Sequence, residues 1–227
     1  MDKEVYVALL IDDHPIIRSS YKEAAKLVAN TLEGVSFIFE EAGNCDEAIS
    51  KVNVLAKSGV KNCLVFLDIS LPASKDKSIV SGEDLGIWIN KKLPQSKIIV
   101  STAFNDNYRI HNILKNLNPD GFLVKNDTTP KELINAISDI VSDPPYYSKT
   151  VLKLLRKESS NDYLLDEIDR KLLYELSQGT LMKELPDILH LSMAGVEKRK
   201  RQLKLIFDVE STSDRELLSI ARVKGFI

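Results

Sequence analysis

The sequence predicts an α/β protein, a doubly wound five-stranded parallel sheet followed by a small all-α domain. Over the first 142 residues, short apolar runs of β type alternate with segments of helical periodicity. Strands that alternate with helices favour parallel β-α units. From Leu164 onward the hydrophobic pattern is wholly helical, which predicts the second domain.

The predicted strands are the runs VYVALLI (5–11), SFIFEEA (36–42), CLVFLD (63–68), KIIVSTA (97–103) and DGFLVK (120–125). The run at 63–68 is almost continuously apolar, which is typical of a strand covered on both faces. The segments between the runs have apolar residues at helical spacing. The last of them begins with Thr129 and Pro130, a favourable helix start.

The run PPYYS (144–148) ends the alternation, and LLRKESSND (154–162) indicates a short helix that leads into a polar linker. We therefore predict a first domain over residues 1–142, a linker over 143–163 and a second domain over 164–227.

Composition describes an ordinary globular chain. Of the 227 residues, 44% are hydrophobic and 28% are charged, and the formal net charge is -2. The first residues, MDKEVYVALLI, contain no basic leader, and their apolar run is too short for a signal or a membrane span. We expect a cytoplasmic protein without a membrane partner. Cys45 and Cys63 lack metal or disulfide spacing and are predicted to be buried, reduced thiols.

Acidic residues stand at the ends of two predicted strands. Asp12 and Asp13 follow the first strand, and Asp68 ends the third. If these strands are neighbours, the carboxylates meet at one crevice. Their repulsion would be relieved by Mg²⁺, which prefers carboxylate oxygens, waters and a substrate phosphate. His14 is interpreted as a structural or surface residue, because Mg²⁺ is poorly matched to imidazole.

A hydroxyl and an ammonium stand at the ends of the next two strands, on Thr102 and Lys125. Together with the carboxylates they predict a phosphoryl-transfer site. Taken singly, an aspartate that ends a strand is more often a turn or capping residue, and a lysine there is more often solvated. The hypothesis depends on their occurrence together.

The first domain resembles the receiver domain of two-component response regulators, a flavodoxin-like or CheY-like fold. The resemblance is carried by IDDH (11–14), LDISLP (67–72), STA (101–103) and FLVK (122–125), in this order. It implies that Asp68 is the phosphoacceptor and takes a phosphoryl group from a phosphohistidine of a sensor histidine kinase. It also implies a magnesium site formed by Asp12, Asp13, Asp68 and the backbone carbonyl of Ser70.

By the same resemblance, Lys125 would pair with the phosphoryl oxygens and Thr102 would move to hydrogen-bond one of them. Phe122 would turn inward as part of this switch, although a plain core role fits that residue equally well. The loop from Asp68 to Gly82 is longer than is usual in the family. We interpret its KDKSIVS segment as a tolerated surface insertion, with an effect on kinase choice or acyl phosphate lifetime as the alternative.

The second domain resembles the helix-turn-helix of NarL/LuxR-type regulators. The pattern is met by Gly179, Lys183, Glu184, Leu191, Ser192 and Val196. Gly195 departs from it, because a threonine usually precedes the valine. Pro186 also departs from it and should shorten or kink the second helix.

The predicted third helix, residues 193–207, carries the run EKRKR and a local positive charge, as a recognition helix in the major groove should. Lys198, Arg201 and Gln202 are expected to share one outward face, and by the resemblance Glu197, Lys198 and Arg201 are candidates for contacts with base edges. Arg199 and Lys200 are expected to point sideways, toward phosphates or the surface of the domain. The candidate DNA-binding residues are Glu197, Lys198, Arg199, Lys200, Arg201, Gln202 and Lys204.

Together the two resemblances imply a response regulator that is not an enzyme, binds promoter DNA and forms a homodimer when phosphorylated. One alternative is an adaptor that acts through protein contacts and has a degenerate helix-turn-helix. A third hypothesis is a magnesium hydrolase that uses the same carboxylates.

Overall fold

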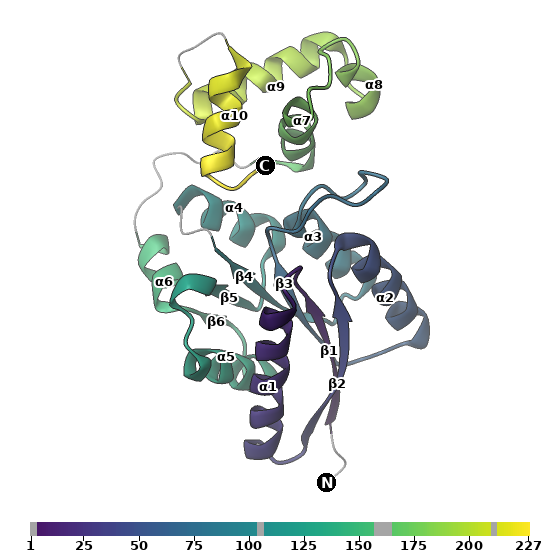
Figure 1. Ribbon diagram of the computed structural model, residues 1–227, viewed down its shortest axis with the longest axis vertical. Helices are drawn as coiled ribbons and strands as arrows, with labels where there is room; N and C mark the ends of the chain where they lie inside the picture. The colour runs from purple at the N-terminus through teal and green to yellow at the C-terminus, as the bar shows by residue number, and fades with distance from the viewer. Residues whose placement is uncertain (1–3, 104–106, 157–164, 210–212) are drawn as a thin grey trace. The chain divides into compact units, whose positions relative to one another are not determined.

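The computed structural model describes residues 4–103, 107–156, 165–209 and 213–227 (Figure 1). The chain divides into two compact units. Met1–Asn105 and Leu117–Arg156 form the first unit, and Asp106–Asn116 and Lys157–Ile227 form the second. Helix α4 (Asn107–Leu117) therefore groups with the second unit over almost its whole length. The domain boundaries inferred from the sequence stay predictions.

The first unit is built on a parallel sheet. Its strands are β1 (Glu4–Ile11), β2 (Val35–Ala42), β3 (Cys63–Asp68), β4 (Lys97–Thr102), β5 (Gly121–Val124) and β6 (Tyr146–Tyr147), in the order β2-β1-β3-β4-β5-β6. The predicted doubly wound sheet is confirmed. Because β1 and β3 are neighbours, their carboxyl ends meet at one edge of the sheet.

The predicted number of five strands is wrong by one. Tyr146 and Tyr147, from the run taken to end the alternation, pair with β5. The Tyr146 N–H donates to the Asp120 carbonyl at 2.9 Å, and the Ser148 N–H donates to the Phe122 carbonyl at 3.0 Å. The free edge of β5 offers these backbone groups, but a two-residue strand is too short to show a hydrophobic period. Ser148 then caps helix α6 (Lys149–Leu155).

Four helices cover the sheet as sequence periodicity predicts. They are α1 (Pro15–Thr31), α2 (Cys45–Ser58), α3 (Gly82–Lys92) and α5 (Pro130–Ser142), with α1 and α5 on one face and α2 and α3 on the other (Figure 1). Side chains of Asn44, Ser81 and Thr129 cap α2, α3 and α5 by accepting a backbone N–H of the first turn. Thr129 also forms the predicted favourable start, a capping box with Glu132.

The core beneath α1 and α5 supports the strand ends. Leu10, Phe66, Ile99 and Leu123 belong to it, one from each central strand. Tyr21 of α1 stacks on Phe66, with ring centroids 4.9 Å apart. All six residues of β3 are buried, as its continuous apolar run predicts. The two cysteines are free and buried, also as predicted, and burial raises the pKa of each thiol to about 12.

The second unit contains the helices α7 (Glu167–Ser177), α8 (Leu185–Leu189), α9 (Met193–Ile206) and α10 (Asp214–Val223). Leu172, Leu185, Val196 and Leu203 are fully buried in its core. Ser192 caps α9 by accepting the Gly195 N–H at 3.2 Å. Pro186 lies in the first turn of α8, where a missing N–H is tolerated, rather than in the helix interior that the sequence predicted, and α8 has only five residues.

The longer loop between β3 and α3 is an ordered projection beyond the strand ends (Figure 1). The Ser74 N–H donates to the Ile79 carbonyl at 2.8 Å, which closes a tight turn. Inside the turn, the Asp76 carboxylate accepts the Ser74 hydroxyl at 2.7 Å and the Ser78 N–H at 3.0 Å. These bonds lower the pKa of Asp76 to about 2. Within the described ranges, no helix has the length and apolarity that a bilayer crossing requires.

Gly82 begins α3 against the end of β3. A Cβ at this position would lie 2.0 Å from the Asp68 carbonyl oxygen, a backbone atom that cannot swing aside. We expect Gly82→Ala to lower the free energy of unfolding by about 1–3 kcal/mol, the usual cost of overpacking. Gly43→Ala is the control, because its nearest neighbours would lie 3.6 Å away. Urea unfolding compares the two, and equal stability would contradict the close approach at Gly82.

Candidate functional site

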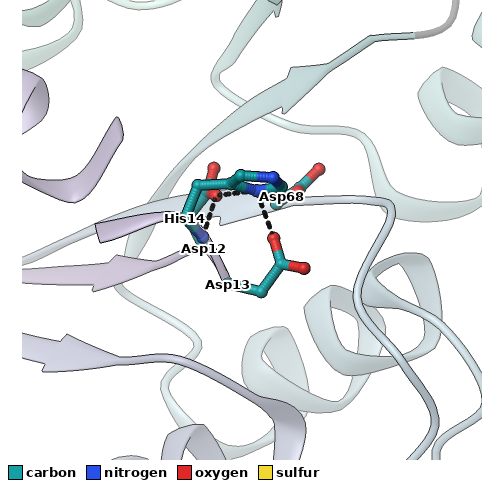
Figure 2. A group of neighbouring side chains, drawn as sticks. All are labelled: Asp12, Asp13, His14 and Asp68. Atoms are coloured by element: carbon teal, nitrogen blue, oxygen red, sulfur yellow. Dashed lines mark hydrogen bonds and ion pairs between the residues drawn. The ribbon is translucent and has the colours of Figure 1, made fainter. Parts of the chain in front are cut away.

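Three carboxylates meet where β1 and β3 end. Asp12 and Asp13 directly follow β1, and Asp68 is the last residue of β3. Asp12 and Asp68 are buried, whereas Asp13 is exposed. Figure 2 shows these side chains with His14, and one ligand atom from each of the four lies within 4.8 Å of the others. The structure thus brings together the acidic residues that the sequence places at separate strand ends.

Lys125, which follows β5, bridges the two buried carboxylates. Its Nζ lies 2.7 Å from Asp12 Oδ2 and 2.8 Å from Asp68 Oδ2. Burial alone would lower the pKa of Lys125, but the hydrogen bonds to the two aspartates outweigh it and raise the pKa. For Asp68 the balance is reversed, because burial raises its pKa more than the Lys125 and Ser70 hydrogen bonds lower it.

Backbone N–H groups orient the buried carboxylates. The Ser70 N–H donates to Asp68 Oδ1 at 3.0 Å, while Lys125 holds Oδ2 of the same group. In the same way the His14 N–H donates to Asp12 Oδ1 at 3.0 Å. Each carboxylate is therefore held from two sides. The role of the Ser70 carbonyl as a metal ligand stays a prediction.

His14 is an exposed residue, as expected, but it also belongs to the acidic cluster. Its Nδ1 lies 2.5 Å from Asp13 Oδ1 and 3.4 Å from Asp12 Oδ1, and its side chain is 66% exposed. The poor match of imidazole to Mg²⁺ does not by itself indicate this position. The place of His14 directly after Asp13, at the cap of α1, is the signal that places it here.

Thr102 and Phe122 lie on one face of the sheet. Val100 pairs in register with Phe122, and Thr102 with Val124. Alternate residues of a strand face the same side, so Thr102 and Phe122 share a face. Both side chains are fully buried. Asp68 pairs in register with Ser101, the neighbour of Thr102, so the Asp68 side chain leaves the sheet on the opposite face. This placement is compatible with a Thr102–Phe122 switch, which stays a prediction.

The donor set suits a hard divalent cation. Three carboxylates from two adjacent strand ends supply the oxygen ligands that Mg²⁺ prefers. Oxygens on opposite sides of Mg²⁺ lie about 4 Å apart, so a cluster within 4.8 Å needs little closing. The residues present therefore fit the predicted magnesium site.

The basic residues of α9 divide into two groups. Lys198 and Arg201 are exposed and lie one turn apart, next to the exposed Glu197. Gln202 is half-buried. Arg199 turns back to α7, where its Nη1 lies 2.9 Å from Asp166 Oδ2 and 2.7 Å from Asp169 Oδ1.

Asp214 of α10 forms ion pairs with two more of the predicted DNA-binding residues, Lys200 and Lys204. Its carboxylate oxygens lie 3.0 Å from Lys200 Nζ and 3.1 Å from Lys204 Nζ. Arg199, Lys200 and Lys204 therefore have acidic partners inside the unit, and much of the local positive charge read from the sequence is balanced there.

No family model matches the chain. It is similar to the oxygen regulatory protein NreC of Staphylococcus epidermidis, with 22% identity over 222 residues, 89% of this chain and 91% of the relative. It is also similar to the nitrate/nitrite response regulator protein homolog of Haemophilus influenzae, with 24% identity over 206 residues, 89% of this chain and 90% of the relative.

Among solved structures, RcsB of Salmonella enterica serovar Typhimurium, bound to promoter rprA in the presence of phosphomimetic BeF3-, has the same fold. The TM-score is 0.66 at 22% identity, and the likeness covers 96% of this chain and 98% of RcsB. The isolated REC domain of RcsB has a TM-score of 0.53 and covers 66% of this chain. Over most of its length the chain is thus similar to two-component response regulators of the NarL/LuxR type.

The α/β unit and the helical unit of this chain both have counterparts in RcsB. The acidic cluster and Lys125 lie in the α/β unit. The likeness to the isolated REC domain, over two thirds of the chain, shows the same fold for a single domain.

Burial of Asp68 makes the stability of the protein depend on pH. Its pKa is raised above that of the unfolded chain, so its contribution to stability is complete below the unfolded pKa. This contribution is lost as pH rises through the raised folded pKa. In EDTA, we expect Asp68→Asn to have a higher free energy of unfolding than wild type at neutral pH. The difference should shrink on acidification, as urea unfolding at several pH values would measure. A less stable Asp68→Asn at neutral pH would contradict this expectation.

Proposed function

We propose that the chain is a phosphorylation-dependent, DNA-binding response regulator that controls transcription downstream of a sensor histidine kinase. One observation carries this proposal: the buried carboxylate of Asp68 lies at a strand end, 2.8 Å from Lys125 Nζ and beside a second pair of carboxylates. A structural ion pair alone needs one carboxylate for one ammonium. The surplus negative charge is favourable where a cation and a phosphoryl group bind.

In this proposal Asp68 is the nucleophile. One of its carboxylate oxygens forms a bond to phosphorus, and the bond between phosphorus and the donor's histidine nitrogen breaks, so that the imidazole leaves with the electron pair. Lys125 is already 2.8 Å from Asp68 Oδ2, and its ammonium is in place to pair with a phosphoryl oxygen. The product is an acyl phosphate, and the protein is a phosphoacceptor rather than an enzyme that turns over.

Asp12, Asp13, Asp68 and the Ser70 carbonyl would hold Mg²⁺, which when bound supplies positive charge to the phosphoryl oxygens. Thr102 would hydrogen-bond the phosphoryl group, and Phe122, on the same sheet face, would move with it. This pair is the two-state element that phosphorylation would bias, with dimerisation or release of the helical unit as the output.

For DNA recognition, the proposal relies on α9. It follows the short helix α8 after a turn, the arrangement of a helix-turn-helix. Lys198 and Arg201 are exposed on it and available to bases. The solved RcsB structures support the proposal by analogy, since one contains promoter DNA and another contains two RcsB dimers bound to two parallel DNAs.

The adaptor alternative is favoured by one observation. Arg199, Lys200 and Lys204 pair with acidic residues of the same unit, so fewer cations are available for phosphates than the sequence suggests. An adaptor would keep the phosphorylation site and lose specific DNA binding.

Phosphorylation can be tested with phosphoramidate and Mg²⁺, followed by intact mass measurement. We expect one phosphoryl group on wild type and none on Asp68→Asn, which keeps the shape of the side chain but lacks the anionic nucleophile. Asp76→Asn, a nearby carboxylate held inside the β3–α3 loop, should be labelled like wild type. Equal labelling of Asp68→Asn would show that another residue is the acceptor.

DNA recognition can be tested on a site selected from a random-sequence DNA pool. Arg201→Ala should reduce the preference for that site over scrambled DNA by about 1–3 kcal/mol if Arg201 reads a base. Lys204→Ala is the matched control on the same helix, because its ammonium pairs with Asp214. Binding is measured by fluorescence anisotropy at several salt concentrations. Failure to select any site, or identical specificity of the Arg201→Ala variant, would favour the adaptor.

A further inference from the structure

Arg18 of α1 connects the helix to the ends of two strands beside the acidic cluster. Its Nη1 donates a hydrogen bond to the backbone carbonyl oxygen of Asp12, and its Nε donates to Glu41 Oε2 at 3.2 Å. Glu41 lies near the end of β2, and the Arg18 side chain is only 15% exposed. A largely buried guanidinium therefore contacts the backbone directly after β1, where the predicted metal-binding residues begin.

The carbonyl that Arg18 holds belongs to the peptide group between Asp12 and Asp13. Because a peptide group is planar, a donor held at its oxygen restrains the whole plane. The plane contains the Asp13 Cα atom, so the contact restrains the point from which the Asp13 side chain leaves the backbone. The Asp12 carboxylate is also held by Lys125 and by the His14 N–H. The described contact of Asp13 is with the exposed His14 ring, so its position depends more on the backbone.

Only the forked guanidinium of arginine makes both contacts. Its N–H groups lie in one plane and reach the carbonyl and the carboxylate together, whereas a lysine ammonium is a single point charge. The charge of Arg18 is balanced by Glu41, which also pairs with Lys22 at 3.3 Å. We therefore expect Arg18 to act on the cluster through geometry rather than through its net charge.

We propose that Arg18 is a positioning residue for the divalent cation site. It holds the Asp12–Asp13 peptide so that the Asp13 carboxylate is presented to the cation together with those of Asp12 and Asp68. The inference rests on the proposed function, to which the cation site belongs.

The test is a titration of the full chain with Mg²⁺, followed by isothermal titration calorimetry. Arg18→Met should raise the dissociation constant for Mg²⁺ about tenfold, the size of effect expected for a residue that orients metal ligands. Lys22→Met is the matched control, since it removes a cation from the same helix and the same Glu41 partner without touching Asp12. It should change the dissociation constant by less than about twofold, as a remote surface charge does. Urea unfolding verifies that each variant is folded during the titration.

Arg18→Lys keeps the positive charge but cannot make both contacts, so it should bind Mg²⁺ nearly as weakly as Arg18→Met. If Arg18→Met does not fold, the Arg18→Lys variant replaces it in the titration. Unchanged affinity in the folded Arg18 variants, or equal weakening by Lys22→Met, would overturn the inference.

Asp13→Asn separates this inference from the proposed function. It should weaken Mg²⁺ binding whether or not Arg18 positions the peptide. If Asp13→Asn binds Mg²⁺ like wild type, the cation site itself is wrong. If Asp13→Asn weakens Mg²⁺ binding but the Arg18 variants bind Mg²⁺ like wild type, the cation site is supported and the positioning role of Arg18 is wrong.

Discussion

The contact of one ammonium with two buried carboxylates organises the whole crevice. Lys125 joins the end of β5 to the ends of β1 and β3, so three strands must finish at one level for its contacts of 2.7 and 2.8 Å to form. A buried carboxylate without a partner is costly, which makes this alignment a condition of stability as well as of chemistry. The apolar layer of Leu10, Phe66 and Leu123 beneath it supplies the rigid support that the charged groups themselves lack.

The sequence predicts an element correctly where its hydrophobic periodicity or the order of strands and helices determines it. The continuous apolar run of β3, the cap at Thr129 and the alternation of strands and helices each predict the element that is observed. The meeting of Asp12, Asp13, Asp68 and Lys125 follows from topology alone, because parallel strands of a doubly wound sheet end at a common edge. That Thr102 and Phe122 share a face follows from strand register, which was not known before the structure.

What could not be predicted depends on partners distant in sequence. The charge run of α9 shows no sign that Asp166, Asp169 and Asp214 will neutralise Arg199, Lys200 and Lys204, since the partners lie on other helices. In the same way, the hydrogen bond from Arg18 to the Asp12 carbonyl joins a side chain to a backbone oxygen, and no residue pattern predicts it. The two-residue strand β6 was missed because pairing with β5, rather than its own sequence, makes it a strand.

The short strand β6 also protects the sheet from unwanted association. Without it, the backbone of β5 would present an open edge on which another extended chain could add. A two-residue edge offers too few backbone groups for such growth. At the opposite edge, β2 is eight residues long and exposes Ile38, but its end carries Glu40 and Glu41, which are held in ion pairs by Lys51, Arg18 and Lys22. Any strand that joined this sheet would have to do so at β2, alongside that charged end.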